Sequence, residues 1–455
     1  MINHKVAKKN NLYSIIDKDK ICKMFIITLI SIIVLLNISQ DFSNRVLTNI
    51  IAFFVMYISV YITMTYRKNI MAFCMFFMMT YFNYSIIFSR YIHVLEHLYQ
   101  EFYPNIDNKT YGVGITILLV FMVSLYLVEP KLQRKLNYEE GYYFKDYANI
   151  WVVLSCILIL IYIYIFAFDK SSFGQRGATS PLYEYSGIFF IIAYYYCGKG
   201  KRLNILKIGI SLLILIFCIQ GFIYGERIAG LQFMLIMFAF LFSSRINYKM
   251  IIVVFAGGVL FMSAIGIYRA TYEAGVMSLK LVIDKLSQNM FTFGGADLAY
   301  YCSLTFIMVA EFTSRLDKFI LFIKFILSIF FGTSKISGAD LPTYTRQYYM
   351  HWYGGIYPYY FYFYFGWIGV IISSLFCGKI IKTIISNTIQ SKSFIRILKL
   401  YIIVTLPRWY MYSPQILFRG IILFTIIYGI FQFINLLTIR RYRFISFINR
   451  GSNNE

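Results

Sequence analysis

Long apolar stretches separated by shorter polar connections recur along the whole chain. A helix needs about 20 apolar residues to cross the roughly 30 Å hydrocarbon layer of a membrane. The pattern therefore predicts an all-α polytopic membrane protein with about 12 transmembrane helices. The predicted spans cover residues 24–39, 46–65, 70–89, 111–128, 150–168, 183–197, 205–223, 228–242, 250–267, 356–378, 397–414 and 416–437.

One polar connection, at residues 268–355, is far longer than the others. It contains five apolar residues at the spacing of an amphipathic helix on a membrane surface: Leu279, Val282, Ile283, Leu286 and Met290. The later apolar run Phe319–Phe331, interrupted by Lys324, is short for a span and predicts an interfacial or re-entrant helix. In an alternative, Leu298–Ser314 and Phe319–Phe331 form a hairpin of two further spans, which gives fourteen spans and leaves the termini on the same side.

Neither an internal repeat nor a linker divides the chain, so we expect one membrane domain in three consecutive parts. Residues 1–267 are predicted to hold a cytoplasmic N-terminal tail and the first nine helices. Residues 268–355 are predicted to form a long periplasmic loop. Residues 356–455 are predicted to hold the last three helices and a basic cytoplasmic tail.

Composition and charge agree with a membrane protein and set its orientation. Hydrophobic residues make up 59% of the chain and charged residues 14%, which excludes a soluble enzyme, a disulfide scaffold and a disordered protein. The net charge of +23 is better explained by topology than by nucleic-acid binding, because Lys and Arg gather in cytoplasmic loops. With both termini inside, the predicted inner segments hold 27 of the 43 Lys and Arg residues. We therefore predict that both termini are cytoplasmic.

Three arginines in the predicted outer segments are candidates for anion binding. Arg227 follows a tight turn and opens the next predicted helix, Arg269 ends the ninth predicted span, and Arg176 lies in another outer loop. Guanidinium donors beside the free N–H groups of a helix start form a natural anion site. In the alternative, each arginine extends to the interface or pairs locally, Arg227 with Glu226 and Arg269 with Glu273.

Arg408 differs from these because it lies within a predicted span, directly after Pro407. An ionisable side chain within a span is costly and indicates a function. The alternative is a structural bond from Arg408 to backbone carbonyls that Pro407 leaves without a donor.

His351 is a candidate general base, since an imidazole titrates near neutral pH. It lies where the long loop returns to the membrane, in a stretch (residues 343–364) that contains nine of the chain's 42 tyrosines. Aromatic faces there could hold sugar rings, and we name Trp352, Tyr353 and Tyr357 as candidates for glycan binding. The alternative is an aromatic belt at the membrane interface.

We expect neither a metal site nor a cofactor. His93-Val94-Leu95-Glu96-His97 matches a spacing that places two zinc ligands on one helix face. No third ligand is evident from the sequence, so a polar helix end explains this stretch better.

Together these features resemble the Wzy-type O-antigen polymerases, which polymerise oligosaccharide repeat units for bacterial surface polysaccharides. The resemblance covers the whole predicted topology. Its local motifs are Gly225-Glu226-Arg227, Arg269 at the end of a span, His351-Trp352-Tyr353-Gly354-Gly355, Phe365-Gly366-Trp367-Ile368-Gly369, and the ten-residue spacing between Arg176 and Gly187. The related O-antigen ligases share this architecture.

The resemblance implies a fold similar to the GT-C type, in the bacterial inner membrane, and a glycosyltransferase that needs no cofactor. The donor is a glycan on undecaprenyl diphosphate, and the acceptor is the sugar of another lipid-linked repeat unit. The implied diphosphate ligands are Arg176, Arg227, Arg269 and Arg408. The implied proton acceptors are His351, Asp297 and Glu311. A chain-length regulator protein and a flippase are the implied protein partners.

Two other functions fit the predicted topology. An O-antigen ligase uses the same chemistry and differs in its acceptor, lipid A–core. A lipid-linked oligosaccharide flippase or transporter also has about 12 spans, but it is expected to show two similar halves and an internal cationic cavity.

Overall fold

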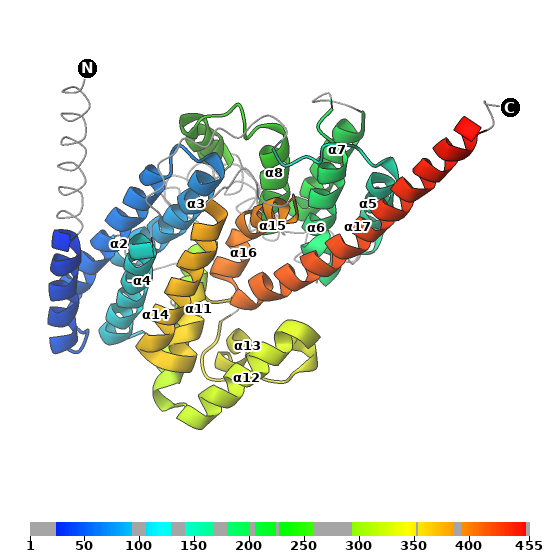
Figure 1. Cartoon of the computed structure of the whole chain (residues 1–455). Helices are drawn as coiled ribbons and strands as arrows, with labels where there is room; N and C mark the ends of the chain where they lie inside the picture. Colours follow the sequence, from blue (N-terminus) through cyan, green and yellow to red (C-terminus); the bar gives the residue numbers. More distant parts are fainter. Residues whose placement is uncertain are drawn as a thin grey trace, which may run out of the picture.

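The computed structural model describes residues 24–92, 106–128, 142–167, 180–200, 205–223, 227–258, 294–351, 354–385 and 393–451. Within these ranges every regular element is a helix, so the predicted all-α class is confirmed (Figure 1). The predicted amphipathic helix around Leu279–Met290 lies outside the described residues.

The regular elements described in the first half of the chain are all helices. Asparagines start several of them: the side chains of Asn44, Asn69 and Asn149 accept bonds from free backbone N–H groups at the starts of α2, α3 and α5. The elements are Met24–Ser39, α2 Arg45–Thr65, α3 Ile70–Ile87, the π-helix η1 Phe88–Ile92, α4 Asn108–Val128, α5 Ile150–Phe166, α6 Pro181–Tyr196, α7 Ile205–Ile223, α8 Arg227–Leu241 and Tyr248–Gly258.

The described part of the long connection forms helices of two kinds. Its elements are α11 Gly294–Phe312, α12 Arg315–Phe331, the 3-10 turn η3 Thr333–Lys335 and the short α13 Leu341–Thr345. α11 is buried along nearly its whole length and packs on α3, α4 and α14. α12 crosses one end of the bundle instead (Figure 1). Whether it lies at a membrane interface, as the sequence predicts, stays a prediction.

The last part of the chain contains two breaks. α14 Tyr357–Ile385 is interrupted at Gly366, whose φ of 62° is rarely adopted by residues with a side chain. α15 Ser393–Val404 ends just before Pro407, and α16 Leu406–Met411 continues as a separate short helix. α17 Pro414–Gly451 completes the chain.

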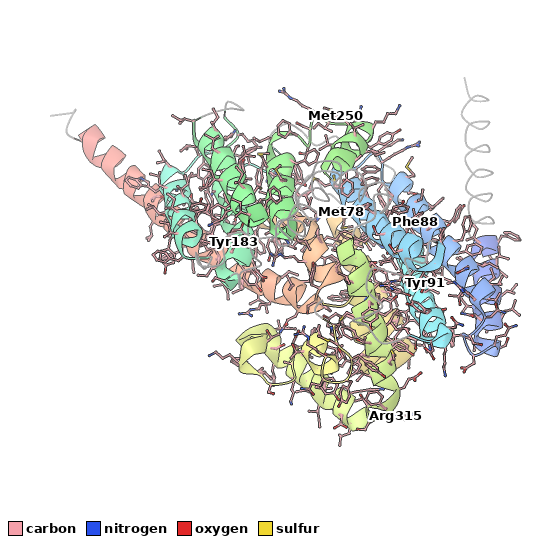
Figure 2. The ribbon with its side chains drawn as sticks, turned by 180° about the vertical axis from the view of Figure 1, so that it is seen from behind. Met78, Phe88, Tyr91, Tyr183, Met250 and Arg315 are labelled. Carbon is pink, nitrogen blue, oxygen red and sulfur yellow. The ribbon has the colours of Figure 1, made fainter. Side chains whose placement is uncertain are left out.

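The bundle has two distinct ends. Arg315 of α12 lies at one of them and Met250 at the other (Figure 2). We call these the α12 end and the α17 end, because α17 terminates on the side of Met250 (Figure 1).

Six of the described helices are long and apolar enough to cross a membrane: Arg45–Thr65, Ile70–Ile92, Asn108–Leu127, Ile205–Ile223, Tyr357–Thr383 and Pro414–Ile439. Four shorter apolar helices accompany them: Met24–Ser39, Ile150–Phe166, Ile228–Leu241 and Tyr248–Gly258. The chain is thus a helical membrane protein, whereas the number of spans and the orientation stay predictions.

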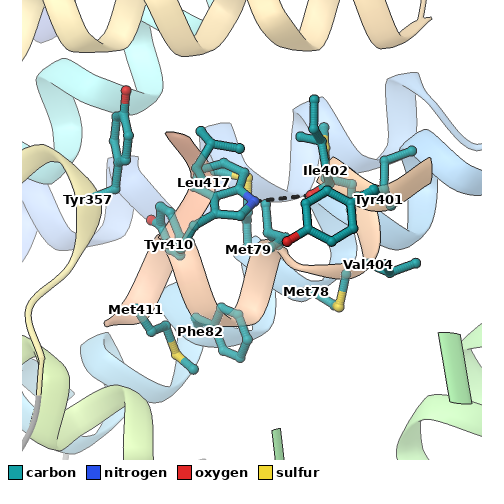
Figure 3. Packing of buried hydrophobic residues seen from close by; sticks show 14 of the residues in the cluster. Met78, Met79, Phe82, Tyr357, Tyr401, Ile402, Val404, Tyr410, Met411 and Leu417 are labelled. Carbon is teal, nitrogen blue, oxygen red and sulfur yellow. Dashed lines mark hydrogen bonds between the residues drawn. The ribbon is translucent and has the colours of Figure 1, made fainter. Parts of the chain in front are cut away.

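The break between α15 and α16 is filled by aromatic packing. The indole nitrogen of Trp409 donates to the carbonyl of Ile402 over 3.0 Å. Tyr410 stacks on Phe82 of α3 (Figure 3). Its hydroxyl donates to Oδ1 of Asn83 over 3.2 Å. Trp409 therefore supplies the kind of carbonyl contact that the sequence suggested for Arg408.

Candidate functional site

Arg408 forms an ion pair with Glu184, a residue that the sequence did not single out. The guanidinium Nη1 lies 2.6 Å from Oε1 of Glu184. The Arg408 side chain is only 7% exposed, whereas that of Glu184 is 35% exposed. A nearly buried cation thus faces a carboxylate that remains accessible to a ligand.

The local sequence explains how this pair forms. Glu184 lies in the first turn of α6, where a negative charge is favoured by the helix dipole. Arg408 lies in α16, where the helix has just restarted after Thr405. The pairing joins residues 224 positions apart in the chain, so only the acidic first turn of α6 could have indicated it from sequence.

An apolar cavity of about 390 Å³ reaches α16, the helix that carries Arg408, although neither Arg408 nor Glu184 lines it. Its wall is built from α3, α7, α8, α16 and the helix Tyr248–Gly258. α16 contributes Pro407 and Met411, which flank Arg408 along the chain. One short helix therefore presents hydrocarbon contacts to the cavity and a cation to Glu184.

The start of α8 borders the same cavity. α8 begins at Arg227, as predicted, and the next residue, Ile228, already lines the cavity. Residues that line the cavity continue along α8 as far as Phe238. At 1.5 Å per residue, this part of the helix is about 15 Å long. The cavity thus extends along α8 from the free N–H groups of its first turn.

A second arginine lies near Glu184. The guanidinium of Arg419, in α17, lies 5.9 Å from the ring centroid of Tyr185, the residue after Glu184. Its Nη1 lies 3.1 Å from the position that a Cβ atom would take on Gly332. The glycine therefore leaves room for this guanidinium.

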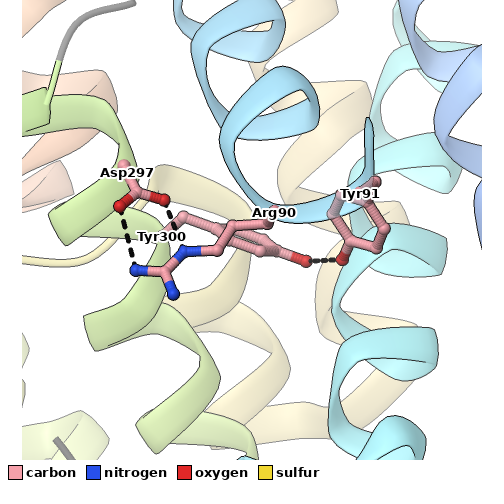
Figure 4. Close-up of polar contacts among 4 residues, drawn as sticks. All are labelled: Arg90, Tyr91, Asp297 and Tyr300. Atoms are coloured by element: carbon pink, nitrogen blue, oxygen red, sulfur yellow. Dashed lines mark hydrogen bonds and ion pairs between the residues drawn. The ribbon is translucent and has the colours of Figure 1, made fainter. Parts of the chain in front are cut away.

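Asp297 lies in a different ion pair. Its carboxylate accepts two bonds from Arg90, at 2.5 and 2.9 Å (Figure 4). Arg90 belongs to the π-helix η1, and the neighbouring Tyr91 hydrogen-bonds the hydroxyl of Tyr300. This pair joins η1 to α11 and occupies both oxygens of Asp297.

His351 and Tyr357 are buried among other side chains. His351 is 1% exposed, and its Nε2 lies 2.9 Å from Oγ1 of Thr345 and 3.9 Å from Sγ of Cys302. Tyr357 is fully buried against Trp409. These contacts explain the burial: His351 joins the turn after α13 to α11, and Tyr357 packs against the break in α15–α16.

The other predicted site residues are only partly described. Glu311 is exposed near the end of α11. Arg176, Arg269, Trp352 and Tyr353 lie outside the described residues, as do His93, His97 and the side chain of Arg227. Among the residues whose placement is described, no group of three His, Cys, Asp or Glu side chains is arranged to hold a metal ion.

Comparison with known proteins found no family model, no curated protein and no solved structure that matches this chain.

Proposed function

We propose that the chain is a Wzy-type polymerase, a glycosyltransferase that joins undecaprenyl-diphosphate-linked repeat units at the outer face of the bacterial inner membrane. The observation that carries this proposal is that α16 holds Arg408, which pairs with Glu184, and also Pro407 and Met411, which line an apolar cavity. A lipid diphosphate needs both a cationic site and an adjacent hydrocarbon site. In this proposal the α12 end faces the periplasm, both termini are cytoplasmic, and the fold is a twelve-span arrangement similar to the GT-C type.

The donor lipid would bind along α8. Its diphosphate would contact Arg408 and the first turn of α8, where Arg227 begins the helix. Its polyprenyl chain would enter the cavity, whose volume lies within the usual 300–1,000 Å³ of ligand pockets. Such a cavity takes only part of a long chain, so the rest would remain in the lipid. Arg176 and Arg269 are the further diphosphate ligands implied by the resemblance.

Glu184 would act as the proton acceptor. When a diphosphate takes over Arg408, the Glu184 carboxylate loses its cation and faces the acceptor sugar. The acceptor hydroxyl oxygen then bonds the anomeric carbon of the donor, the bond from that carbon to the diphosphate breaks, and the hydroxyl proton passes to Glu184. Arg408 stabilises the charge that develops on the departing diphosphate. Of the residues considered earlier, Glu311 remains the alternative base, because Asp297 is bound by Arg90 and His351 is buried.

The surface-glycan ladder of a deletion strain tests this function. A polymerase deletion leaves a single repeat unit on the lipid core, and the wild-type gene restores the ladder. Accumulation of free lipid-linked polymer would instead identify an O-antigen ligase, and loss of every outer repeat unit would identify a flippase. Either of these results would refute the polymerase.

A further inference from the structure

A second basic region lies at the opposite end of the bundle. Residues 142–149, here called the α4–α5 segment, are held against the C-terminal end of α6. The backbone N–H groups of Lys145 and Asn149 each donate over 2.9 Å, to the carbonyls of Tyr195 and Tyr196. Gly198, with a φ of +75°, permits this approach, because a Cβ atom there would lie 2.7 Å from the backbone nitrogen of Ala148.

Aromatic rings contact two basic side chains here, Lys145 of the α4–α5 segment and Arg396 of α15. The Lys145 ammonium lies 4.4 Å from the ring centroids of both Tyr147 and Tyr196. The Arg396 guanidinium lies 5.3 Å from the ring of Tyr142, and its Nη1 donates to the Tyr142 carbonyl over 2.8 Å. A ring attracts a cation without supplying a negative charge that would neutralise it. The Lys145 ammonium is buried in these contacts.

Lys207 of α7 adds a further positive charge next to the α4–α5 segment. Its ammonium lies 4.1 Å from the ring of Phe144, and the side chain is buried. Like the Lys145 ammonium, which is also buried, it cannot reach an external ligand directly. The two buried charges reinforce the field of Arg396 and of the exposed Lys199.

The carboxylates do not cancel this charge. Among the described residues at the α17 end, Asp146 is the only acidic one, and it lies 2.7 Å from Lys199. The hydrogen bond and charge of Lys199 lower the pKa of Asp146. The flanking stretches 129–141 and 201–204, whose structure is not described, hold five basic and three acidic residues, so their charge is also positive.

An apolar helix face begins directly beside these cations. α5 starts at Ile150, the residue after the segment. Its outward side chains are exposed and apolar: Ile150, Trp151, Leu154, Leu158, Ile161 and Phe166. A tryptophan near the start of such a face is typical of the boundary between lipid headgroups and acyl chains.

From this juxtaposition we infer that Lys199 and Arg396, reinforced by the buried charges of Lys145 and Lys207, bind the phosphate of an anionic phospholipid whose acyl chains lie along α5. Basic sites between membrane helices bind such headgroups. An excess of basic loop residues alone requires no fixed side-chain position. Here ring and carbonyl contacts hold Arg396 in place, which reduces the entropy lost on binding. The site is separate from the one proposed for the lipid diphosphate.

Quenching of Trp151 fluorescence by brominated lipids tests this site. The purified full chain is reconstituted in phosphatidylcholine vesicles with increasing brominated phosphatidylglycerol, and the Trp151→Phe variant identifies the contribution of Trp151. We expect brominated phosphatidylglycerol to quench Trp151 at about tenfold lower mole fraction than brominated phosphatidylcholine. Equal quenching by the two lipids would refute the site.

Three variants identify the residues. Lys199→Met is expected to weaken the phosphatidylglycerol effect about tenfold, whereas Lys249→Met, an exposed lysine elsewhere at the α17 end, leaves it unchanged. Asp146→Asn changes only an exposed side chain and is expected to strengthen the effect, because Lys199 is released to the phosphate. Equal losses in the two lysine variants, or no gain in Asp146→Asn, would contradict the inference.

Inorganic phosphate separates a lipid ligand from a soluble one. We expect phosphate at low millimolar concentration to leave the quenching unchanged, because it lacks the acyl chains that contact α5. Displacement of the brominated lipid by phosphate would overturn the lipid assignment and identify a soluble phosphate ligand.

Discussion

Two ion pairs, Arg90–Asp297 and Arg408–Glu184, contain the same kinds of groups in opposite surroundings. In the first, two bonds join the partners, and the side chains are 19% and 10% exposed. In the second, Arg408 is 7% exposed and its partner carboxylate 35% exposed. The first pair is enclosed by helices on both sides, whereas the second is open on the side of its carboxylate.

The difference in exposure separates a structural role from a binding role. Removal of one partner from an enclosed pair leaves an uncompensated charge in a medium that solvates it poorly. Water or a ligand can replace the carboxylate of an open pair at much lower cost. Arg90–Asp297 therefore holds η1 against α11, while Arg408–Glu184 is suited to exchange one anion for another.

The largest expected effect is on catalysis. Glu184→Gln preserves the size of the side chain but removes its ability to accept a proton, so we expect the polymerisation rate to fall roughly 10²–10⁴-fold. The rate is measured with purified protein and a lipid-linked repeat unit. Glu311→Gln is the matched control and is expected to polymerise at nearly the wild-type rate. If Glu311→Gln is inactive and Glu184→Gln is active, the base is Glu311.

A loss of stability is expected at the enclosed pair. Arg90→Leu leaves Asp297 unpaired, which should lower the free energy of unfolding by about 3–5 kcal/mol. Thermal unfolding in detergent measures this change. The double variant Arg90→Leu, Asp297→Leu is expected to recover much of the loss, because no charge remains buried. A single variant as stable as the wild type would show that the pair is not structural.

A smaller effect is expected from filling the cavity. Leu231 of α8 lines it, and Leu231→Trp should raise the KM for a donor with a full polyprenyl chain by about tenfold, since overpacking costs roughly 1–3 kcal/mol. A donor with a shortened chain is the internal control and should bind equally well to both proteins. Equal effects on the two donors would place the polyprenyl chain elsewhere.

The smallest expected effect is a pH-dependent change in stability at the α17 end. Lys199 lowers the pKa of Asp146 below its ordinary value of 3.8. The pair therefore stabilises the folded state above this pH, and the stabilisation is lost as the pH falls through the lowered pKa. The difference in unfolding temperature between wild type and Asp146→Asn should be small at pH 6 and vanish at lower pH. A difference in unfolding temperature that grows as the pH falls would contradict the predicted direction of the pH dependence.

The sequence predicted the helices better than the site. Helix positions follow from hydropathy and local caps, both of which are local properties, and the start of α8 at Arg227 was predicted on this basis. The partner of Arg408 was not, because no periodicity links α6 to α16. The burial of His351 and Tyr357 could not be predicted either, since buried aromatic packing and an interfacial belt have the same composition.

The most direct test of the account is the affinity of purified protein for undecaprenyl diphosphate. We expect Arg408→Ala to bind it about ten- to hundredfold more weakly than the wild type, because one charge-assisted contact is worth roughly 1.5–3 kcal/mol. Arg408→Lys should retain part of the affinity, since it keeps the charge without the two-pronged donor geometry. Glu184→Gln should bind at least as tightly as the wild type, because the competing carboxylate is gone. Wild-type affinity in Arg408→Ala would contradict the central claim that this open ion pair is the diphosphate site.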